Sequence, residues 1–202
     1  MGGTVRTGRI VAGVVWGSAL LALGIWSWSH VRSAIRYAEL LSAEPPGTLP
    51  IPIGGLGPAG LADTWGDPRS DGRSHQGIDI FAARRTPVRS TTAGIVARRG
   101  HGGLGGRTVT IVGPGGQRHY YAHLQQYGGQ ARGEWVAAGE VIGFVGTSGN
   151  APPDAPHLHY GIYTGGGAVN PYPLLTVGPF PAPAVGPAPA PASRTPAPGA
   201  PR

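Results

Sequence analysis

The middle of the chain, from about Thr48 to Thr176, alternates short apolar runs with turns that are rich in glycine. The runs carry β-branched and aromatic residues, which are typical of strands. No segment of this region keeps a helical period of 3.6 residues. We therefore expect one mostly β domain over residues 48–176, which is long enough for a single core. The predicted strands are residues 77–81, 94–97, 108–112, 119–123, 141–145 and 158–162.

An uncharged and mostly apolar stretch, residues 10–28, precedes this domain. A helix of about twenty such residues spans the hydrocarbon core of a bilayer, and two tryptophans at its end would suit the aromatic belt of the membrane. A cleaved signal peptide is the alternative, because Arg6 and Arg9 stand before the apolar stretch. That stretch is longer than the apolar part of a signal peptide, and no A-x-A pattern follows it directly. We therefore expect a retained membrane helix over residues 10–29, with residues 1–9 in the cytoplasm.

The segments on either side of the domain have different compositions. Residues 30–47 are expected to form a short helix and a linker, because apolar residues recur at helical spacing until Pro45-Pro46-Gly47 ends the pattern. Arginines flank the membrane segment on both sides, so charge hardly decides its orientation. We expect a single-pass protein of the cytoplasmic membrane whose domain lies on the periplasmic or extracellular side. Residues 177–202 alternate proline and alanine with almost no charge, which predicts a disordered tail.

The composition limits the chemistry that is open to this chain. It has no cysteine among 202 residues, which excludes disulfide scaffolds, thiolate metal sites and cysteine nucleophiles. The formal net charge of +7 comes from arginine alone, since the chain has no lysine. Several arginines between Arg69 and Arg89 would aid solubility or attract an anionic polymer. A nucleic acid is not expected as a partner, because no arginine run is interleaved with aromatic residues.

Two short motifs offer ligands for a metal ion. Asp79 is the only acidic residue near a histidine in a segment that reads as ordered, and it follows His75 by four positions. His157 and His159 form an H-x-H pair about eighty residues later. Residues two or four apart in a strand project from the same face, so both motifs are able to face one cleft. Three ligands with a fourth position open are typical of catalytic rather than structural zinc.

Further blocks extend this pattern along the domain. They are His75-x-Gly77-x-Asp79, Thr86-Pro87-Val88, Gly94-Ile95-Val96, Tyr121-Ala122-His123-Leu124, Gly139-Glu140-Val141-Ile142-Gly143, Gly146-Thr147-Ser148-Gly149-Asn150, Pro156-His157-Leu158-His159-Tyr160 and Val169-Asn170-Pro171. In this order, over nearly all of residues 60–176, they resemble the blocks of the M23 peptidases. These are the lysostaphin-like or LytM-type zinc endopeptidases of bacterial cell walls. Two positions depart from the family pattern: Arg85 stands where a glycine commonly precedes Thr-Pro-Val, and Gly161 replaces a frequent glutamate.

The resemblance implies an antiparallel β-sheet fold with the site in a groove across the main sheet. It also implies that His75, Asp79 and His159 bind zinc and that His123 and His157 are the catalytic histidines. The chemistry agrees, because zinc activates a bound water as the nucleophile and histidine moves protons near neutral pH. Which histidine acts as base stays open, and so does a role for both in orienting the ligands by hydrogen bonds.

The function implied is a membrane-anchored zinc metalloendopeptidase that hydrolyses peptide cross-links of peptidoglycan. The alternatives are a non-catalytic module that binds the wall or activates another hydrolase, and a peptidase that cuts a secreted protein. The presence of every ligand and of both catalytic histidines favours the enzyme. His101 and His119 match no family block and are interpreted as surface or structural residues.

Overall fold

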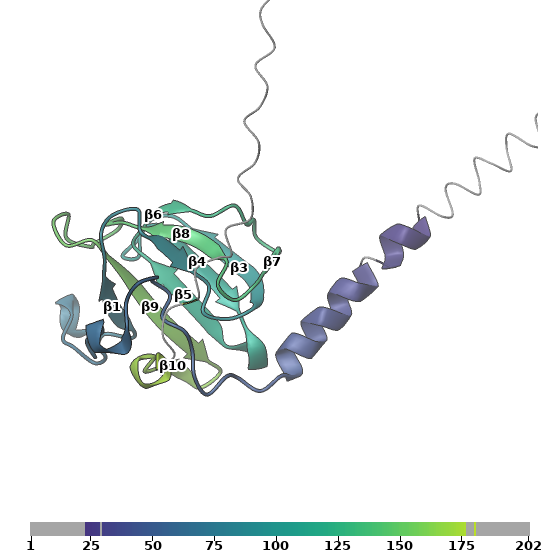
Figure 1. The fold of residues 1–202 in the computed structure, drawn as a ribbon, viewed down its shortest axis with the longest axis horizontal. Coiled ribbons are helices and arrows are strands. Elements are labelled where there is room, and N and C mark those ends of the chain that lie inside the picture. Colours follow the sequence, from purple (N-terminus) through teal and green to yellow (C-terminus); the bar gives the residue numbers. More distant parts are fainter. Residues whose placement is uncertain (1–22, 29, 177–179, 181–202) are drawn as a thin grey trace, which may run out of the picture.

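The computed structural model describes residues 23–28, 30–176 and 180 (Figure 1). Residues 23–28 and 30–42 are helical, and the chain leaves the helix before Pro45. Leu40 is buried, and the guanidinium of Arg36 lies 4.1 Å from the centre of the Trp135 ring. The end of this helix therefore lies against the β domain, and the helix extends away from it (Figure 1).

The predicted membrane segment, residues 10–29, lies for the most part outside the described residues. Within the described part of the chain, no helix is both long and apolar enough to cross a bilayer. Residues 1–9 and nearly all of the predicted tail over 177–202 also lie outside the described residues. The membrane helix, the cytoplasmic segment and the disordered tail therefore remain predictions.

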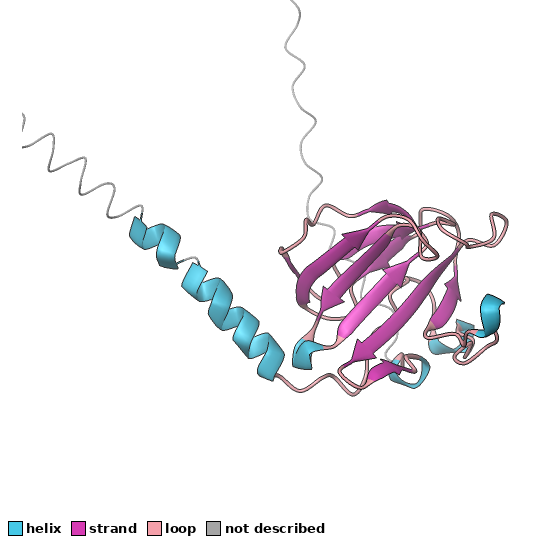
Figure 2. Cartoon of the chain, turned by 180° about the vertical axis from the view of Figure 1, so that it is seen from behind, coloured by secondary structure: helices cyan, strands magenta, loops and turns pink. Residues whose placement is uncertain are grey.

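The domain is mostly β, as the sequence pattern predicts, and its strands pair antiparallel, as the family resemblance implies. The larger sheet has the order β1-β9-β5-β4-β3-β7, with β10 also paired to β9, and the smaller sheet has the order β2-β8-β6 (Figures 1 and 2). The strands are β1 (Ile78–Phe81), β2 (Pro87–Arg89), β3 (Gly94–Gly100), β4 (Thr108–Val112), β5 (Arg118–Ala122), β6 (Leu124–Tyr127), β7 (Trp135–Val136), β8 (Val141–Val145), β9 (His157–Thr164) and β10 (Gly167–Val169). The described residues also form four 3₁₀ turns. Two of them, η1 (Pro58–Gly60) and η2 (Ser70–Gly72), precede β1, η3 (Pro114–Gly116) lies between β4 and β5, and η4 (Tyr172–Leu174) follows β10.

The core combines one face of the larger sheet with the smaller sheet. Strand alternation sends Ile78 and Ile80 of β1, and Leu158 and Tyr160 of β9, into this core, where all four are almost fully buried. The residues between them face the opposite side of the sheet. Because the apolar residues of β1 and β9 occupy the core side, a site is able to form only on the other face of these two strands.

His119 of β5 belongs to the core. It is fully buried, its Nδ1 lies 2.8 Å from the hydroxyl of Tyr160, and Thr91 Oγ1 lies 3.3 Å from the same nitrogen. Burial lowers the pKa of His119 to about 4, so the ring is neutral at neutral pH. Of the two interpretations for this residue, surface or structural, the structural one is correct.

The backbone conformation of Arg85 suits the glycine of the family pattern at this position. Its φ angle is 67°, in the left-handed region, and its backbone N–H donates to the carbonyl of Val145 at 2.8 Å. A side chain costs about 1 kcal/mol in this conformation, whereas glycine adopts it freely. The departure from the family pattern therefore concerns the backbone of the turn between β1 and β2.

We expect Arg85→Gly to be more stable than Arg85→Ala by about 1 kcal/mol, because both variants remove the same side chain and only alanine keeps the strain. Chemical denaturation of the two variants measures the difference. An alanine variant that equals or exceeds the glycine variant in stability would contradict the strain at this position.

Candidate active site

Strand pairing brings the two predicted motifs together on one face of the larger sheet. In the antiparallel register of β1 and β9, Asp79 lies opposite His159, and Phe81 lies opposite His157. Directly opposed residues project from the same face. Asp79, His157 and His159 therefore share the face that the core leaves available, as the strand period predicts.

His75 completes a tight group of potential metal ligands with Asp79 and His159. His75 Nε2 lies 2.8 Å from His159 Nδ1, and Asp79 Oδ1 lies 3.1 Å from each of these two nitrogens. Ligand atoms around a tetrahedral zinc ion are about 3.3 Å apart, given bonds of about 2.0 Å. Among the described residues this is the one group of three or more such side chains whose ligand atoms converge, all lying within 4.8 Å of one another.

The protonation states of these three side chains also suit the binding of a metal cation. His75 Nδ1 donates to the carbonyl of Thr64 at 2.6 Å, so the neutral ring directs the lone pair of Nε2 at the site. Burial would raise the pKa of Asp79, but hydrogen bonds with His159 and His75 and their charges bring it well below its usual range. The carboxylate therefore stays ionised. Two imidazole nitrogens and one carboxylate oxygen are ligands that zinc accepts, and the fit of this donor set to zinc is good.

Neighbouring residues hold the ligands in place. Thr64 Oγ1 accepts the backbone N–H of Asp79 at 3.0 Å, and Arg69 Nη2 donates to Asp79 Oδ2 at 2.5 Å. A Cβ on Gly77 would lie 2.7 Å from the ring of His159, so only glycine fits between the two ligand motifs. Partners of this kind orient ligands and tune their affinity for the metal.

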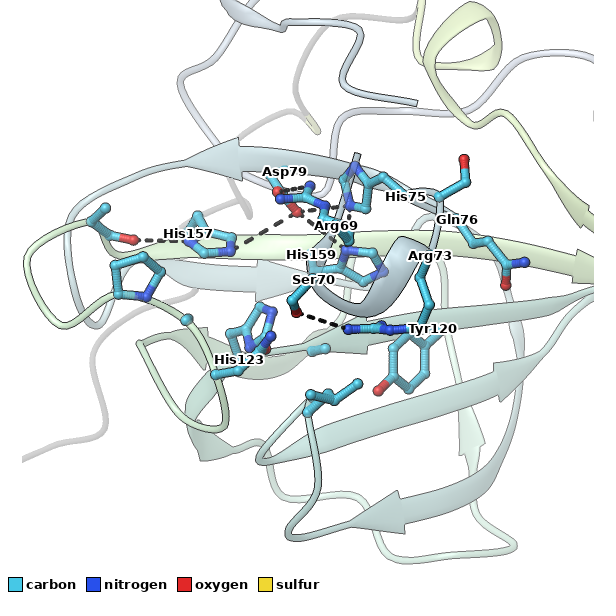
Figure 3. A pocket seen from close by; sticks show the side chains of 18 of the residues that line it. Arg69, Ser70, Arg73, His75, Gln76, Asp79, Tyr120, His123, His157 and His159 are labelled. Carbon is cyan, nitrogen blue, oxygen red and sulfur yellow. Dashed lines mark hydrogen bonds and ion pairs between the residues drawn. The ribbon is translucent and has the colours of Figure 1, made fainter. Parts of the chain in front are cut away.

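The two predicted catalytic histidines lie beside this group (Figure 3). His157 Nδ1 donates to the carbonyl of Ala155 at 2.8 Å, and its Nε2 lies 3.9 Å from Asp79 Oδ1. His123 Nδ1 donates to the carbonyl of Ser148 at 2.8 Å, and its ring centre lies 4.8 Å from that of His157. In each neutral ring Nε2 is therefore the atom that is able to accept a proton.

His123 reaches the site because of its backbone conformation. The sequence places it at the end of a predicted strand over 119–123, in step with His119, but β5 ends at Ala122. Regular alternation would turn His123 toward the core side, where His119 lies. Its φ of 61° instead breaks the alternation, and its N–H donates to the carbonyl of Gly105 at 2.9 Å. Left-handed backbone in a residue other than glycine is uncommon and is concentrated at functional sites.

A cavity of about 630 Å³ runs over these residues. All five predicted site residues line it (Figure 3). The side chains of Arg69 and Arg73, which sequence reasoning did not assign to the site, also line it, and so does the side chain of Tyr120. The arginine cluster around the first motif was the available signal for the two arginines, and nothing in the sequence indicated the hydrogen bond that the N–H of Asp79 donates to Thr64.

Residues 73–171 match the model of peptidase family M23. The chain carries an M23 peptidase domain. The matched residues contain the three potential metal ligands and the two histidines beside them, and M23 is a family of metallopeptidases. The resemblance drawn from the sequence motifs is thereby confirmed.

Named relatives share this M23 domain. The chain is 43% identical over 124 residues to the L-Ala--D-Glu endopeptidase of Bacillus subtilis, covering 55% of this chain and 38% of the relative. It is 43% identical over 99 residues to the DD-carboxypeptidase/endopeptidase Mpg of Neisseria meningitidis, covering 49% of this chain and 22% of the relative. The chain thus spans less than half the length of these curated relatives.

Among solved structures, the catalytic domain of lysostaphin from Staphylococcus simulans is similar to this chain. It superposes with a TM-score of 0.52 at 29% identity, covering 57% of this chain and 91% of that domain. The antiparallel β fold of the M23 domain is therefore lysostaphin-like.

We expect Thr64→Val to weaken zinc binding by the M23 domain about tenfold. The variant removes the hydroxyl that accepts the N–H of Asp79, so the carboxylate of Asp79 is no longer held in position. Thr64→Ser keeps the hydroxyl and is the matched control, with an affinity close to that of the unchanged chain. Competition with a chromogenic zinc chelator measures both. Equal affinities of the valine and serine variants would show that the hydroxyl does not position Asp79.

Proposed function

We propose that this chain is a membrane-anchored zinc metalloendopeptidase that hydrolyses peptide cross-links of bacterial peptidoglycan. The observation that carries the proposal is the convergence of three ligand atoms, from His75, Asp79 and His159, beside two histidines on the wall of one cavity. In a structural zinc site, protein side chains fill all four coordination positions of the metal. Here three ligands face a cavity that is large enough for part of a peptide.

The chemistry of amide hydrolysis matches the side chains of this site. Zinc, when bound, would polarise the scissile carbonyl and lower the pKa of the attacking water. Hydrolysis then needs a group that takes a proton from the water and a group that delivers one to the leaving amine. His123 and His157 would share these tasks through Nε2, since a backbone carbonyl holds Nδ1 of each.

The protonation state of His123 supports a role as proton acceptor. Burial lowers its pKa to about 4, against the hydrogen bond to Ser148, which raises it. The ring is thus neutral at neutral pH, with an acceptor lone pair available. The carbonyl of Ser148 fixes the ring so that no reorientation is needed when the proton moves.

The relatives support the choice of substrate. One is named as an endopeptidase for the L-Ala–D-Glu bond, and another is named as a DD-carboxypeptidase and endopeptidase. A wall peptide is a flexible chain with free carboxylates, and the arginines that line the cavity would attract it. The predicted membrane helix over residues 10–29 would hold the domain on the periplasmic or extracellular side, where this polymer lies.

Digestion of purified peptidoglycan by the full chain in detergent tests the proposal. Zinc-loaded protein should release peptide fragments, which mass spectrometry identifies, and a chelator should stop the release until zinc is added back. Folded, zinc-loaded protein that binds peptidoglycan but releases no fragment would refute the endopeptidase and favour a wall-binding module. Cleavage of a secreted protein but not of the wall would identify a different substrate for the same site.

A further inference from the structure

Two arginines face each other across the loop that leads into the site. The N–H of Arg69 donates to the carbonyl of Arg73 at 2.8 Å, and Pro68 forms a bridge with Ser74 just beyond them. The turn η2 closes this small hairpin. Like charges that lie directly opposite each other in such a pair are destabilising. Their placement therefore calls for an explanation beyond folding.

Both side chains line the cavity (Figure 3). Arg69 uses Nη2 to hold Asp79 Oδ2, and the side chain remains 36% exposed. Arg73 contacts Ser70 Oγ at 3.4 Å, which is a long hydrogen bond. Among the described residues that line the cavity, Asp79 is the only acid, and its charge would be offset by the metal. This part of the cavity is therefore positively charged.

Exposed apolar side chains line other parts of the cavity. In the register of β1 and β9, Phe81 and His157 lie at one end of the cavity. The residues that precede β1 lie toward the other end, where the Tyr163 hydroxyl donates to the carbonyl of Gln76 at 3.4 Å. Phe81 is 58% exposed and lines the cavity at its own end. Leu104, which is also exposed and lines the cavity, accepts a hydrogen bond from the backbone of Asn150. The metal ligands thus lie between Phe81 and His157 at one end and Gln76 and Arg73 at the other (Figure 3).

We propose that Arg69 and Arg73 form a subsite for a free carboxylate on the substrate peptide, on a residue close to the scissile bond. The inference rests on the proposed endopeptidase function and adds the substrate class: an acidic peptide, with an uncharged residue at the Phe81 end. The planar guanidinium suits a carboxylate, because its N–H groups match the two oxygens. Arg73 supplies the specificity, and Arg69 divides its donors between the substrate and Asp79.

Two synthetic stem peptides test the subsite, one with glutamate and one with glutamine at the same position. The zinc-loaded full chain should cleave the glutamate peptide with a kcat/KM about tenfold to a hundredfold higher, the range expected for a charged hydrogen bond. In Arg73→Gln this preference should fall toward one, chiefly through KM. Arg132→Gln, which removes an exposed arginine outside the cavity, should keep the preference.

Binding gives a second readout that does not depend on turnover. In a His123→Asn background, calorimetry should show tighter binding of the glutamate peptide, and Arg73→Gln should abolish the difference. Equal binding of the two peptides, or a preference that survives Arg73→Gln, overturns the subsite. If neither peptide nor peptidoglycan is cleaved but the glutamate preference depends on Arg73, the subsite stands and the endopeptidase proposal fails.

Discussion

Replacement of His159 by alanine is expected to remove bound zinc and to reduce hydrolysis at least about a thousandfold, since the metal supplies several kcal/mol of transition-state stabilisation. His159 contacts both other members of the group: its Nδ1 is 2.8 Å from His75 Nε2 and 3.1 Å from Asp79 Oδ1. The two ligands that remain in the variant are poor at retaining zinc, which in proteins is held by three ligands or more.

His101→Ala is the matched control, because it removes an exposed histidine from a loop outside the metal group. Metal analysis of dialysed protein should find zinc in the control and in the unchanged chain, but not in His159→Ala. Circular dichroism checks that the variant keeps its β structure, since the core side of β9 is untouched. A His159→Ala variant that retains one zinc per chain and its activity would remove His159 from the metal site.

Strand alternation explains why much of this site is predictable from the sequence. The apolar residues Ile78, Ile80, Leu158 and Tyr160 had to be buried, and a period of two then forces the residues between them to the other face. The spacing of Asp79 and His159 therefore carries spatial information even though eighty residues separate them. The same pattern predicts a mostly β domain, and its six apolar runs coincide closely with β1, β3, β4, β5, β8 and β9. The short strands β2, β6, β7 and β10 were not predicted, and only the family resemblance implied that the sheets are antiparallel.

Other features depend on contacts that a periodic pattern does not encode. His123 departs from strand alternation through a left-handed φ, and strand parity alone would direct it toward the core. Thr64 and Arg69 reach Asp79 from a loop whose path is set by the pairing of Pro68 with Ser74. Only the family resemblance located His123 beforehand, and it said nothing of the two loop residues.

Removal of either of the two histidines proposed to transfer protons, His123 or His157, is expected to lower kcat by about 10²–10⁴-fold while zinc remains bound, as for the loss of a general acid or base. The suitable variants are His157→Ala and His123→Asn, because asparagine tolerates the φ of 61° at position 123 better than alanine does.

A zinc-competition assay separates this role from an orienting one. His157 Nε2 lies 3.9 Å from Asp79 Oδ1, so His157 could instead act by holding that ligand. An orienting residue costs about tenfold to a hundredfold in metal affinity when it is removed, and saturating zinc would then restore activity. A proton-transfer residue leaves the affinity nearly unchanged, and no zinc concentration rescues the variant. If added zinc restores the activity of His157→Ala or His123→Asn, the histidine that was replaced orients a metal ligand and does not transfer a proton.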